Sequence, residues 1–501
     1  MFVAAINQRK LKHAPHLQIG QTNSKVDMTA LDKFARVAAL RPAQRKNAPV
    51  PSVSETAAES DRLTQLLGAR INRNHYGEHL SLCEWYSTPE ICSPQARSLS
   101  LLLPPAAVSA SSSARGEAAE HLALALDPEN WLFLDTETTG LAGGTGTYAF
   151  MVGIAWWDSG GLQVEQFFMR DLDEEHSLLL ELSERMKQRP VLVTFNGKSF
   201  DWPLLETRFR MTRSFADFRP KLHLDLLHPS RQLWRLRIGS VRLRDLERQV
   251  LGGRERTLGW TRHDDIDSSL IPQMYFDYLR HGTAEPLVGV FRHNQMDLRG
   301  LAALSGKILS LLDSGNGLAN AAKADAHDPI DVLGLSRLMH KRGHASRARE
   351  LHETALSFGL PRSVERLAQM ELAQMAKREL DYTRAISLWD ALREPCGSQH
   401  AQAAVRQEES ERALESAISA AEQLAIYYEH RAKEPRRALD LILAALSELQ
   451  QAQRDAILAG DKLEKIRTRL DRRLQRLRQR CGKTTPRARA RSGKRTAGIL
   501  A

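Results

Sequence analysis

The chain has 501 residues, and 42% of them are hydrophobic, which is enough apolar material for two or three folded domains. No stretch approaches the roughly 18 uninterrupted apolar residues of a membrane helix, so the sequence argues against a membrane protein. The net charge of +11 favours polyanionic partners such as nucleic acid, although a solubilising surface or a basic tail would give the same value.

The first 127 residues contain three segments of different composition. Residues 1–60 are polar, basic and rich in proline, and we predict a disordered basic segment. Residues 61–104 begin with a helical pattern and continue with alternating stretches such as EHLSLCEWYS, which predict a small strand-containing region. Residues 105–127 include PPAAVSASSSARGEAAE, and this run of small residues predicts a linker.

Residues 128–312 have the pattern of a mixed α/β domain. Three strands are predicted in WLFLDTE, YAFMVGIAWWD and LQVEQFFMRD. They are followed by a helix in EEHSLLLELSERMKQ, a strand in PVLVTFNG, a helix in DWPLLETRFRM and a strand edge in KLHLDLL. Helical stretches follow, and residues 286–312 read as one long helix. Three early strands and a later alternation of helix and strand predict a mixed sheet flanked by helices.

Residues 328–480 are helical and amphipathic throughout. Helix pairs recur, and Ala348, Ala385 and Ala438 align with steps of 37 and 53 residues. The first step is close to the period of about 34 residues of tetratricopeptide repeats, and the second would require an insertion. Other helical solenoids and bundles would give a similar pattern. Residues 481–501 are basic and contain no acid, so we predict a disordered tail suited to contact with nucleic acid.

Four cysteines are scattered along the chain and form no disulfide framework, which favours a reducing, cytoplasmic environment. His75, His79, Cys83 and Cys92 were considered as a zinc site. They lack the usual pairs of closely spaced ligands, and the alternation after Glu78 favours a strand, so zinc is the weaker interpretation.

Two carboxylates, Asp135 and Glu137, follow an apolar run in the stretch FLDTETTG. Side chains two residues apart on a strand point the same way, so these two share one face. Buried like charges repel, and the arrangement becomes favourable when a cation lies between them. Oxygen ligands alone suit Mg²⁺ or Mn²⁺. The alternative is an exposed strand end followed by an ordinary turn.

Two later stretches offer further acidic residues. FNGKSFDW places Asp201 just after a predicted strand, and RHNQMD contains Asp297 with His293 four residues before it. On a helix, His293 and Asp297 lie on one face. Each also has an ordinary interpretation, because Asp201 suits a helix N-cap and the other two suit a surface pair. Asp225, at the end of KLHLD, is the best spare carboxylate, and we interpret it as a cap.

These motifs, in this order, resemble the DEDD family of 3′–5′ exonucleases, which have a ribonuclease H-like fold. The longer string LDTETTGLAGGTGTYAFMVGIAWW resembles more narrowly the YprB-type bacterial branch, in which such a domain is joined to tetratricopeptide-like repeats. The resemblance implies an α/β ribonuclease H-like domain over residues 128–312, followed by an all-α repeat domain over residues 328–480.

The resemblance also implies a mechanism. A two-metal site of Mg²⁺ or Mn²⁺ would hydrolyse the phosphodiester bonds of DNA or RNA from the 3′ end. The implied ligands are Asp135, Glu137, Asp201 and Asp297, and the implied general base is His293. One departure is visible, because three residues separate the histidine from the last aspartate. That is the spacing of the tyrosine subclass of the family, whereas the histidine subclass has four.

Substrate contacts are expected next to these motifs. Glycines let a backbone approach a ligand closely, an exposed aromatic ring can stack on a base, and a lysine can meet a phosphate. An ordinary strand connection, a turn cap and core packing are the alternative roles. The candidate residues are Thr138, Gly140, Leu141, Asn196, Lys198 and Phe200.

A second hypothesis is a catalytically inactive scaffold that keeps the nuclease fold. It would bind nucleic acid through basic segments and recruit protein partners through the helical repeats. The unusual spacing of His293 and Asp297 and the large helical region motivate it. The presence of all four carboxylates argues against it.

Overall fold

The computed structural model describes residues 62–87, 96–101, 112–140, 146–158, 160–212, 219–252, 262, 264–314, 328–394 and 403–483. Residues 1–60, Leu141 and nearly all of the predicted basic tail lie outside this set. Among the described helices, none is both long and apolar enough to span a membrane.

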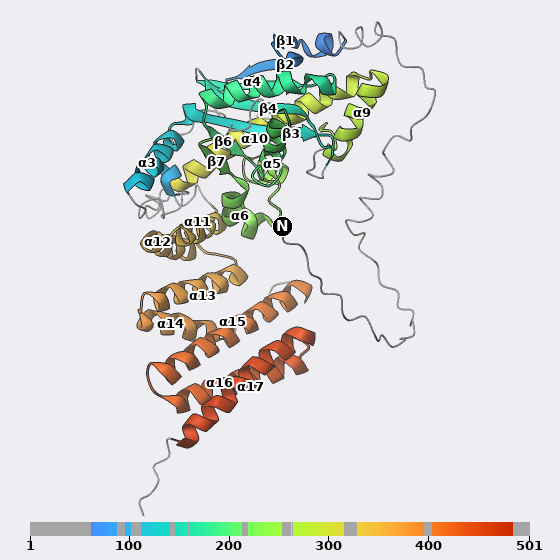
Figure 1. Ribbon diagram of the computed structural model, residues 1–501. Helices are drawn as coiled ribbons and strands as arrows, with labels where there is room; N and C mark the ends of the chain where they lie inside the picture. The colour runs from blue at the N-terminus through green and yellow to red at the C-terminus, as the bar shows by residue number, and fades with distance from the viewer. Residues whose placement is uncertain are drawn as a thin grey trace, which may run out of the picture. The chain divides into compact units, whose positions relative to one another are not determined.

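A seven-stranded mixed sheet organises the first part of the structure (Figure 1). Its strands, in chain order, are β1 (Arg70–Asn74), β2 (Gly77–Tyr86), β3 (Trp131–Thr138), β4 (Ala149–Asp158), β5 (Gly161–Phe168), β6 (Val191–Thr194) and β7 (Leu222–Asp225). The spatial order is β1-β2-β5-β4-β3-β6-β7. Strands β6 and β7 run parallel to β3, and the other neighbours are antiparallel.

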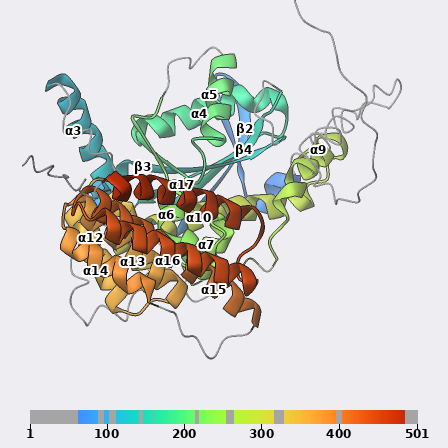
Figure 2. The same ribbon diagram turned by 90° about the horizontal axis from the view of Figure 1, so that it is seen from below.

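The two faces of the sheet are covered by different helices. On β3, Leu132 and Leu134 pack in a core with α4 (Glu175–Gln188), α5 (Asp201–Met211) and α9 (Ile271–His281) (Figure 2). Trp131 and Phe133 point to the opposite face, where they join α6 (Leu227–Ile238), α7 (Leu243–Gln249) and the C-terminal half of α10 (Glu285–Ser314). The strict alternation along β3 explains both cores and confirms the predicted architecture of a mixed sheet between helices.

The first 127 residues differ from the prediction in two respects. Strands β1 and β2 were expected in a separate small region, but β2 pairs with β5 and so extends the main sheet. Helix α3 (Ser112–Leu126) lies where we predicted a linker. Its later residues, including EAAEHLALAL, are mostly strong helix formers, which outweigh the preceding run of small residues.

His79, one of the residues weighed above as zinc ligands, packs in the core of the sheet domain. It lies on β2, is buried, and its Nδ1 is 2.8 Å from the hydroxyl oxygen of Ser177. Burial, with a smaller effect of the nearby Arg170, lowers the pKa of His79 to about 4.

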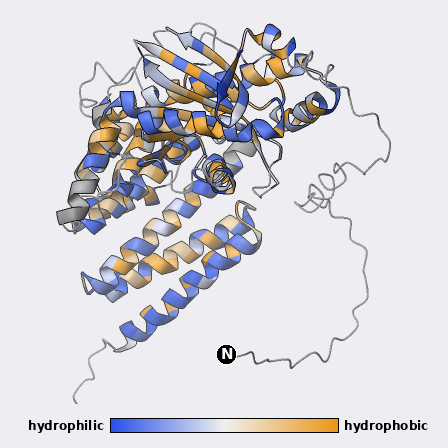
Figure 3. Cartoon of the chain, turned by 45° about the horizontal axis from the view of Figure 1, so that its top comes forward, coloured by the Kyte–Doolittle hydropathy of each residue, from blue (hydrophilic) through white to orange (hydrophobic). Residues whose placement is uncertain are grey.

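The second part of the structure is entirely helical and confirms the predicted change of class. The helices are α11 (Pro329–Lys341), α12 (Ala345–Ser357), α13 (Arg362–Arg378), α14 (Tyr382–Arg393), α15 (Ala403–His430), α16 (Pro435–Arg454) and α17 (Gly460–Lys483). Each contacts the next in the chain (Figure 1). Figure 3 shows hydrophobic and hydrophilic colours alternating along these helices, as expected when one side of each is buried.

Alanines near the start of three of these helices allow close packing. Ala348, Ala385 and Ala438 are all fully buried, on α12, α14 and α16 respectively. The first helix, α11, packs against α6 of the sheet domain. A Cβ atom on Gly334 would lie 2.1 Å from the backbone oxygen of Leu233, so only glycine permits this contact.

Candidate active site

The predicted site lies where parallel strands end. Strands β3 and β6 are parallel, so their carboxyl ends meet at one edge of the sheet, the usual position of functional residues in such sheets. Asp135 and Glu137 occupy the last half of β3, and Asp201 is the first residue of α5, shortly after β6. Helix α10 supplies His293 and Asp297.

A chain of amides reaches the first of these carboxylates. Asn294 donates from Nδ2 to Oδ2 of Asp135 at 2.9 Å, and Gln166 donates to Oδ1 of Asn294 at 2.8 Å. Gly153, which pairs with Asp135 across the strands, makes room for this contact. A Cβ atom there would lie 2.0 Å from Oδ1 of Asn294, so the glycine is required for helix α10 to approach the strand.

The carboxylates affect one another's ionisation. Burial raises the pKa of Asp135, and the charges of Asp297, Asp201 and Glu137 raise it further. Burial also raises the pKa of Glu137 to about 8, although the nearby His293 opposes the shift and the charges of Asp297 and Asp201 add to it. The four predicted carboxylates are therefore close enough to repel, and a cation between them would relieve the repulsion.

Asp201 is fixed by a side chain from the same strand as the first pair. The hydroxyl of Thr136 donates to Oδ1 of Asp201 at 2.6 Å. Burial raises the pKa of Asp201, and this hydrogen bond partly offsets the rise. The capping position of α5 is occupied by Phe200, so Asp201 is one residue inside the helix and points towards β3 instead of serving as the N-cap.

His293 is held between two aspartates. Its Nδ1 is 2.7 Å from Oδ1 of Asp265, and its Nε2 is 3.5 Å from Oδ2 of Asp297. In the neutral ring, an Nδ1–H donating to Asp265 leaves Nε2 as the proton acceptor. Burial lowers the pKa of His293, but the hydrogen bond that it donates to Asp265 and the negative charges of Asp297 and Glu137 outweigh this effect, so the net shift is upward.

A buried arginine balances part of the negative charge. Arg262 contacts Glu247 at 2.5 Å, Asp265 at 2.9 Å, and Asp297. Burial raises the pKa of Glu247 to about 7 despite this partner. Hydrogen bonds from His293 and Arg262 overcome burial and lower the pKa of Asp265 to about 2, so Asp265 stays ionised.

The loop after β6 is organised by Asp225, which acts as the cap that we predicted. Its carboxylate accepts backbone N–H groups from Asn196 at 2.8 Å, Lys198 at 3.2 Å and Leu227 at 3.0 Å. Asn196 adopts a left-handed conformation with φ of 69°, which asparagine tolerates better than most residues. The backbone of this loop is thereby fixed close to Asp201.

The remaining predicted substrate residues lie beside the same edge of the sheet. Phe200 is 60% exposed, which is unusual for a phenylalanine and leaves its ring accessible. Lys198 is also exposed. The hydroxyl of Thr138 donates to the backbone oxygen of Gly140 at 3.0 Å, which shapes the strand end. Leu141, the sixth candidate, lies outside the described residues.

The site contains residues that the sequence did not reveal. Arg262, Asp265 and Asn294 all contact the predicted acids or His293 directly. Asn294 stands beside His293 in RHNQMD, but neither periodicity nor spacing distinguishes it from a surface asparagine. Asp265 lies 28 residues before its histidine partner, so no local pattern connects the two.

The donor chemistry suits a hard divalent cation, because carboxylate oxygens predominate. Among the described residues, no three His, Cys, Asp or Glu side chains converge as a ready-made metal site. The guanidinium of Arg262 also contacts Asp297, a carboxylate that the predicted ligand set requires. The mutual repulsion of the other acids is the observation that fits a cation.

Comparison with known proteins places this geometry in a class. Residues 132–309 match the ribonuclease H superfamily, so the sheet and its helices form a ribonuclease H-like nuclease domain. The chain is also 30% identical over 357 residues to the uncharacterized protein YprB of Bacillus subtilis (strain 168). The aligned region covers 68% of this chain and 74% of that protein. The chain belongs to the YprB family.

Proposed function

We propose that this protein is a metal-dependent 3′–5′ exonuclease that hydrolyses phosphodiester bonds of nucleic acid. The observation that carries the proposal is a set of four partly buried carboxylates, in which Asp135 and Glu137 of β3 lie beside Asp201 of α5 and Asp297 of α10. The charges of Asp297, Asp201 and Glu137 add to burial in raising the pKa of Asp135. A fold with no use for a cation would gain stability by replacing these groups.

Asp135, Glu137, Asp201 and Asp297 are the residues that would hold two Mg²⁺ or Mn²⁺ ions. When bound, such ions supply charge stabilisation for the attacking and leaving oxygens of an in-line displacement. Thr136 orients Asp201, and Asn294 orients Asp135, at 2.6 Å and 2.9 Å respectively. Each contact uses one carboxylate oxygen, which is Oδ1 of Asp201 and Oδ2 of Asp135.

His293 would take the proton of the attacking water at Nε2. Asp265 is the positioning residue, because its bond to Nδ1 fixes the ring and stabilises the protonated form. The three-residue gap between His293 and Asp297 places them one helical turn apart on α10, so the histidine faces the site instead of solvent.

The proposed substrate is the 3′ end of DNA or RNA. Thr138 and Gly140 would line the end of β3, and Leu141 would follow them. Asn196, Lys198 and Phe200 would lie on the opposite side of the end nucleotide, with the exposed ring of Phe200 stacking on a base. We infer that the helix pairs after residue 328 are tetratricopeptide-like repeats available to a protein partner.

Digestion of matched 3′-labelled and 5′-labelled strands of DNA and RNA tests the proposal. With Mg²⁺ or Mn²⁺, the wild type should release the 3′ label first as a nucleoside monophosphate and shorten the 5′-labelled strand stepwise. Asp135→Ala should reduce the rate by at least about 100-fold, because a ligand and its orientation are lost together. Asp173→Ala, which changes an exposed acid, is the matched control.

Equal residual cleavage by wild type and Asp135→Ala would contradict the assignment. Release of internal fragments would replace it with an endonuclease. The contact of Arg262 with Asp297 favours the scaffold alternative, because a guanidinium already neutralises one expected ligand. Calorimetry decides between the two, since a scaffold would bind nucleic acid without binding Mg²⁺ or Mn²⁺.

A further inference from the structure

The positive charge of this chain is concentrated at its C-terminal end. Residues 460–501 contain 15 of the 71 Lys and Arg residues but only 3 of the 60 Asp and Glu residues. The preceding 459 residues therefore carry 56 basic and 57 acidic side chains, so the net charge of +11 arises from the last 42 residues. Helix α17 (Gly460–Lys483) holds ten of those fifteen basic residues.

Helix α17 turns one apolar side to the core. Its buried residues recur every three or four positions and pack against the preceding helices. They are Leu463, Ile466, Leu470, Leu474 and Leu477. The basic residues are therefore confined to the remaining faces of the helix.

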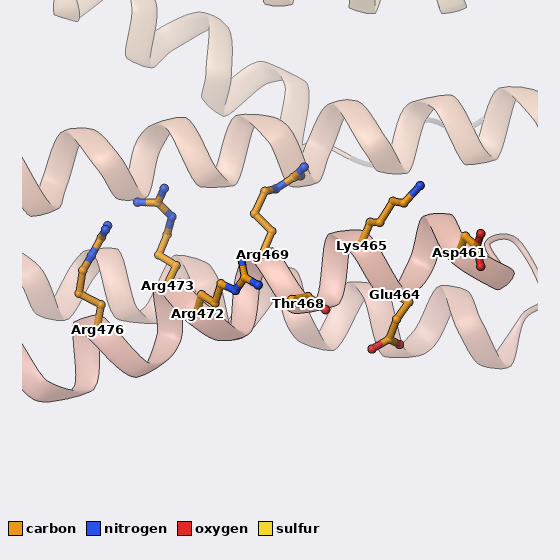
Figure 4. Close-up of a pocket in the computed structure, with 8 residues that line it drawn as sticks. All are labelled: Asp461, Glu464, Lys465, Thr468, Arg469, Arg472, Arg473 and Arg476. Atoms are coloured by element: carbon orange, nitrogen blue, oxygen red, sulfur yellow. The ribbon is translucent and has the colours of Figure 1, made fainter. Parts of the chain in front are cut away.

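One of these faces carries an open groove of about 670 Å³. Figure 4 shows the side chains that line it, with the four arginines following one another along α17 and the two acids near its start. The lining residues are Asp461, Glu464, Lys465, Thr468, Arg469, Arg472, Arg473 and Arg476. Lys465 and Arg476 are eleven residues apart, so the basic face extends about 16 Å along the helix.

The chain neutralises this face only in part. Arg469 pairs with Glu422 of α15 at 2.7 Å. The fully buried carboxylate of Glu429, also on α15, contacts Arg473 at 3.7 Å, Arg476 at 2.7 Å and Arg480 at 3.1 Å. Four arginines therefore share two glutamates. Such crowding is costly unless a further anion joins it.

In the part of the chain that the structure describes, Arg473 lacks hydrogen-bond partners for part of its guanidinium group. Its Nε and Nη1 atoms are buried and have no hydrogen-bond partner among the described residues. Burial, and then the neighbouring charge of Arg476, lowers the pKa of Arg473. Arg472 and Lys465 are exposed at the rim of the same groove. The groove thus combines exposed cations with one arginine whose buried donors are not all satisfied within the described residues.

A series of guanidinium groups along one face of a helix suits a row of phosphates. Guanidinium groups bind phosphate oxygens through paired N–H donors, and a nucleic-acid strand repeats its phosphates at short intervals. Sixteen ångströms correspond to the rise of about five nucleotides in one strand of a duplex. An acidic peptide carries single carboxylates at less regular spacing.

We propose that the Lys465–Arg476 face of α17 binds the phosphate backbone of nucleic acid and so retains the strand that the nuclease domain processes. The proposal rests on the proposed function for the identity of its ligand. It assigns the last helix of the repeat region to the substrate, whereas protein partners would use other surfaces of that region.

Binding of a labelled single-stranded oligonucleotide to the full chain tests the proposal. Titrations in EDTA, between 50 and 200 mM salt, measure affinity without cleavage. The double variant Lys465→Glu/Arg472→Glu should weaken binding by at least about 10-fold and flatten the dependence on salt by about 1.4, because two phosphate contacts are lost. The control Arg454→Glu/Arg478→Glu also reverses two charges, at exposed arginines outside the groove, and should stay within about 2-fold.

Each outcome is informative because all the chains keep the same C-terminal residues. Equal weakening by Arg454→Glu/Arg478→Glu would overturn the proposal, since total charge would then explain the effect. Unchanged oligonucleotide binding by the double variant would also overturn it. If the double variant instead loses binding only to phosphatidylserine vesicles, the face binds anionic lipid and the proposal is likewise overturned. Lys465→Arg/Arg472→Lys should bind like wild type. EDTA removes metal, so this experiment measures binding without cleavage. A negative result here therefore counts against the α17 proposal and leaves the nuclease assignment to the cleavage assay.

Discussion

The acidic site of the sheet domain gathers negative charges, and the basic face of α17 gathers positive charges. In the first, burial and mutual repulsion raise the pKa values of Asp135 and Glu137. In the second, Lys465 and Arg472 are exposed, so water and salt screen their repulsion. The comparison indicates that the degree of burial determines which kind of ligand each site suits. A buried acidic site selects a small hard cation, while an exposed basic row suits an extended polyanion.

Each concentration also has an internal counter-charge. Arg262 serves three acids of the first site, and Glu429 serves three arginines of the second. Arg262 is 9% exposed and Glu429 is completely buried, but two of the arginines around Glu429 are 48% exposed. Water therefore helps to solvate the charges at α17, whereas it is largely excluded from Arg262.

The largest effect should appear when the buried charge is titrated in the metal-free protein. Burial and nearby charges raise the pKa of Glu137 from 4.5 to about 8. The folded protein then binds more protons than the unfolded chain between these values, so stability is highest below pH 4.5 for this group and falls as pH rises through 8. The loss should be about 5 kcal/mol, measured by urea denaturation in EDTA.

Glu137→Gln should remove most of this dependence on pH and stabilise the metal-free protein at pH 8. Glu129→Gln, at an exposed position in the same domain, should leave the dependence unchanged. A wild-type protein whose stability is flat between pH 5 and 8 would show that the acids are not repelling one another. The comparison with α17 would then lose its basis.

Much of the fold could be predicted because its signals are local. Strands β3 to β7 and helix α10 follow apolar periodicity in single segments, and the metal-site candidates stand within short motifs. The pairing of β2 with β5 joins residues about 80 positions apart, and no local pattern specifies it. Arg262 and Asp265 were missed for the same reason, since only the packing of α7, α9 and α10 brings them to the acids.

Removing the counter-charge of the acidic site should have the next largest effect. Arg262→Met leaves Glu247, Asp265 and Asp297 without their cation, and all three are at least partly buried. We expect a loss of about 3 kcal/mol in the metal-free protein, measured by urea denaturation at pH 7.5. The control Arg248→Met changes an arginine that is 72% exposed and should cost less than about 0.5 kcal/mol.

Mg²⁺ sharpens this prediction. With Arg262 gone, Asp297 is released, so Mg²⁺ should stabilise Arg262→Met more than wild type. Equal stabilisation of both proteins by Mg²⁺ would show that Arg262 and the metal do not compete for Asp297, and the guanidinium would be part of the working site.

The smallest effect should come from the matching change on α15. Glu429→Gln removes the anion shared by Arg473, Arg476 and Arg480, but water can solvate the two outer guanidinium groups. We expect a loss of about 1 kcal/mol at low salt, decreasing as salt rises. The control is Glu411→Gln. Glu411 lies on α15 like Glu429 and pairs with the exposed Lys462 of α17, so its loss should cost less than about 0.5 kcal/mol.

The same variant should bind oligonucleotide a few-fold more tightly, because the freed arginines become available to phosphate. This opposite response of stability and affinity is specific to a face that is under-supplied with anions. If Glu429→Gln instead cost as much as Arg262→Met and left binding unchanged, Glu429 would be an ordinary buried ion-pair partner. The arginines of α17 would then be a structural network, and the contrast between a buried acidic site and an exposed basic one would fail at its basic end.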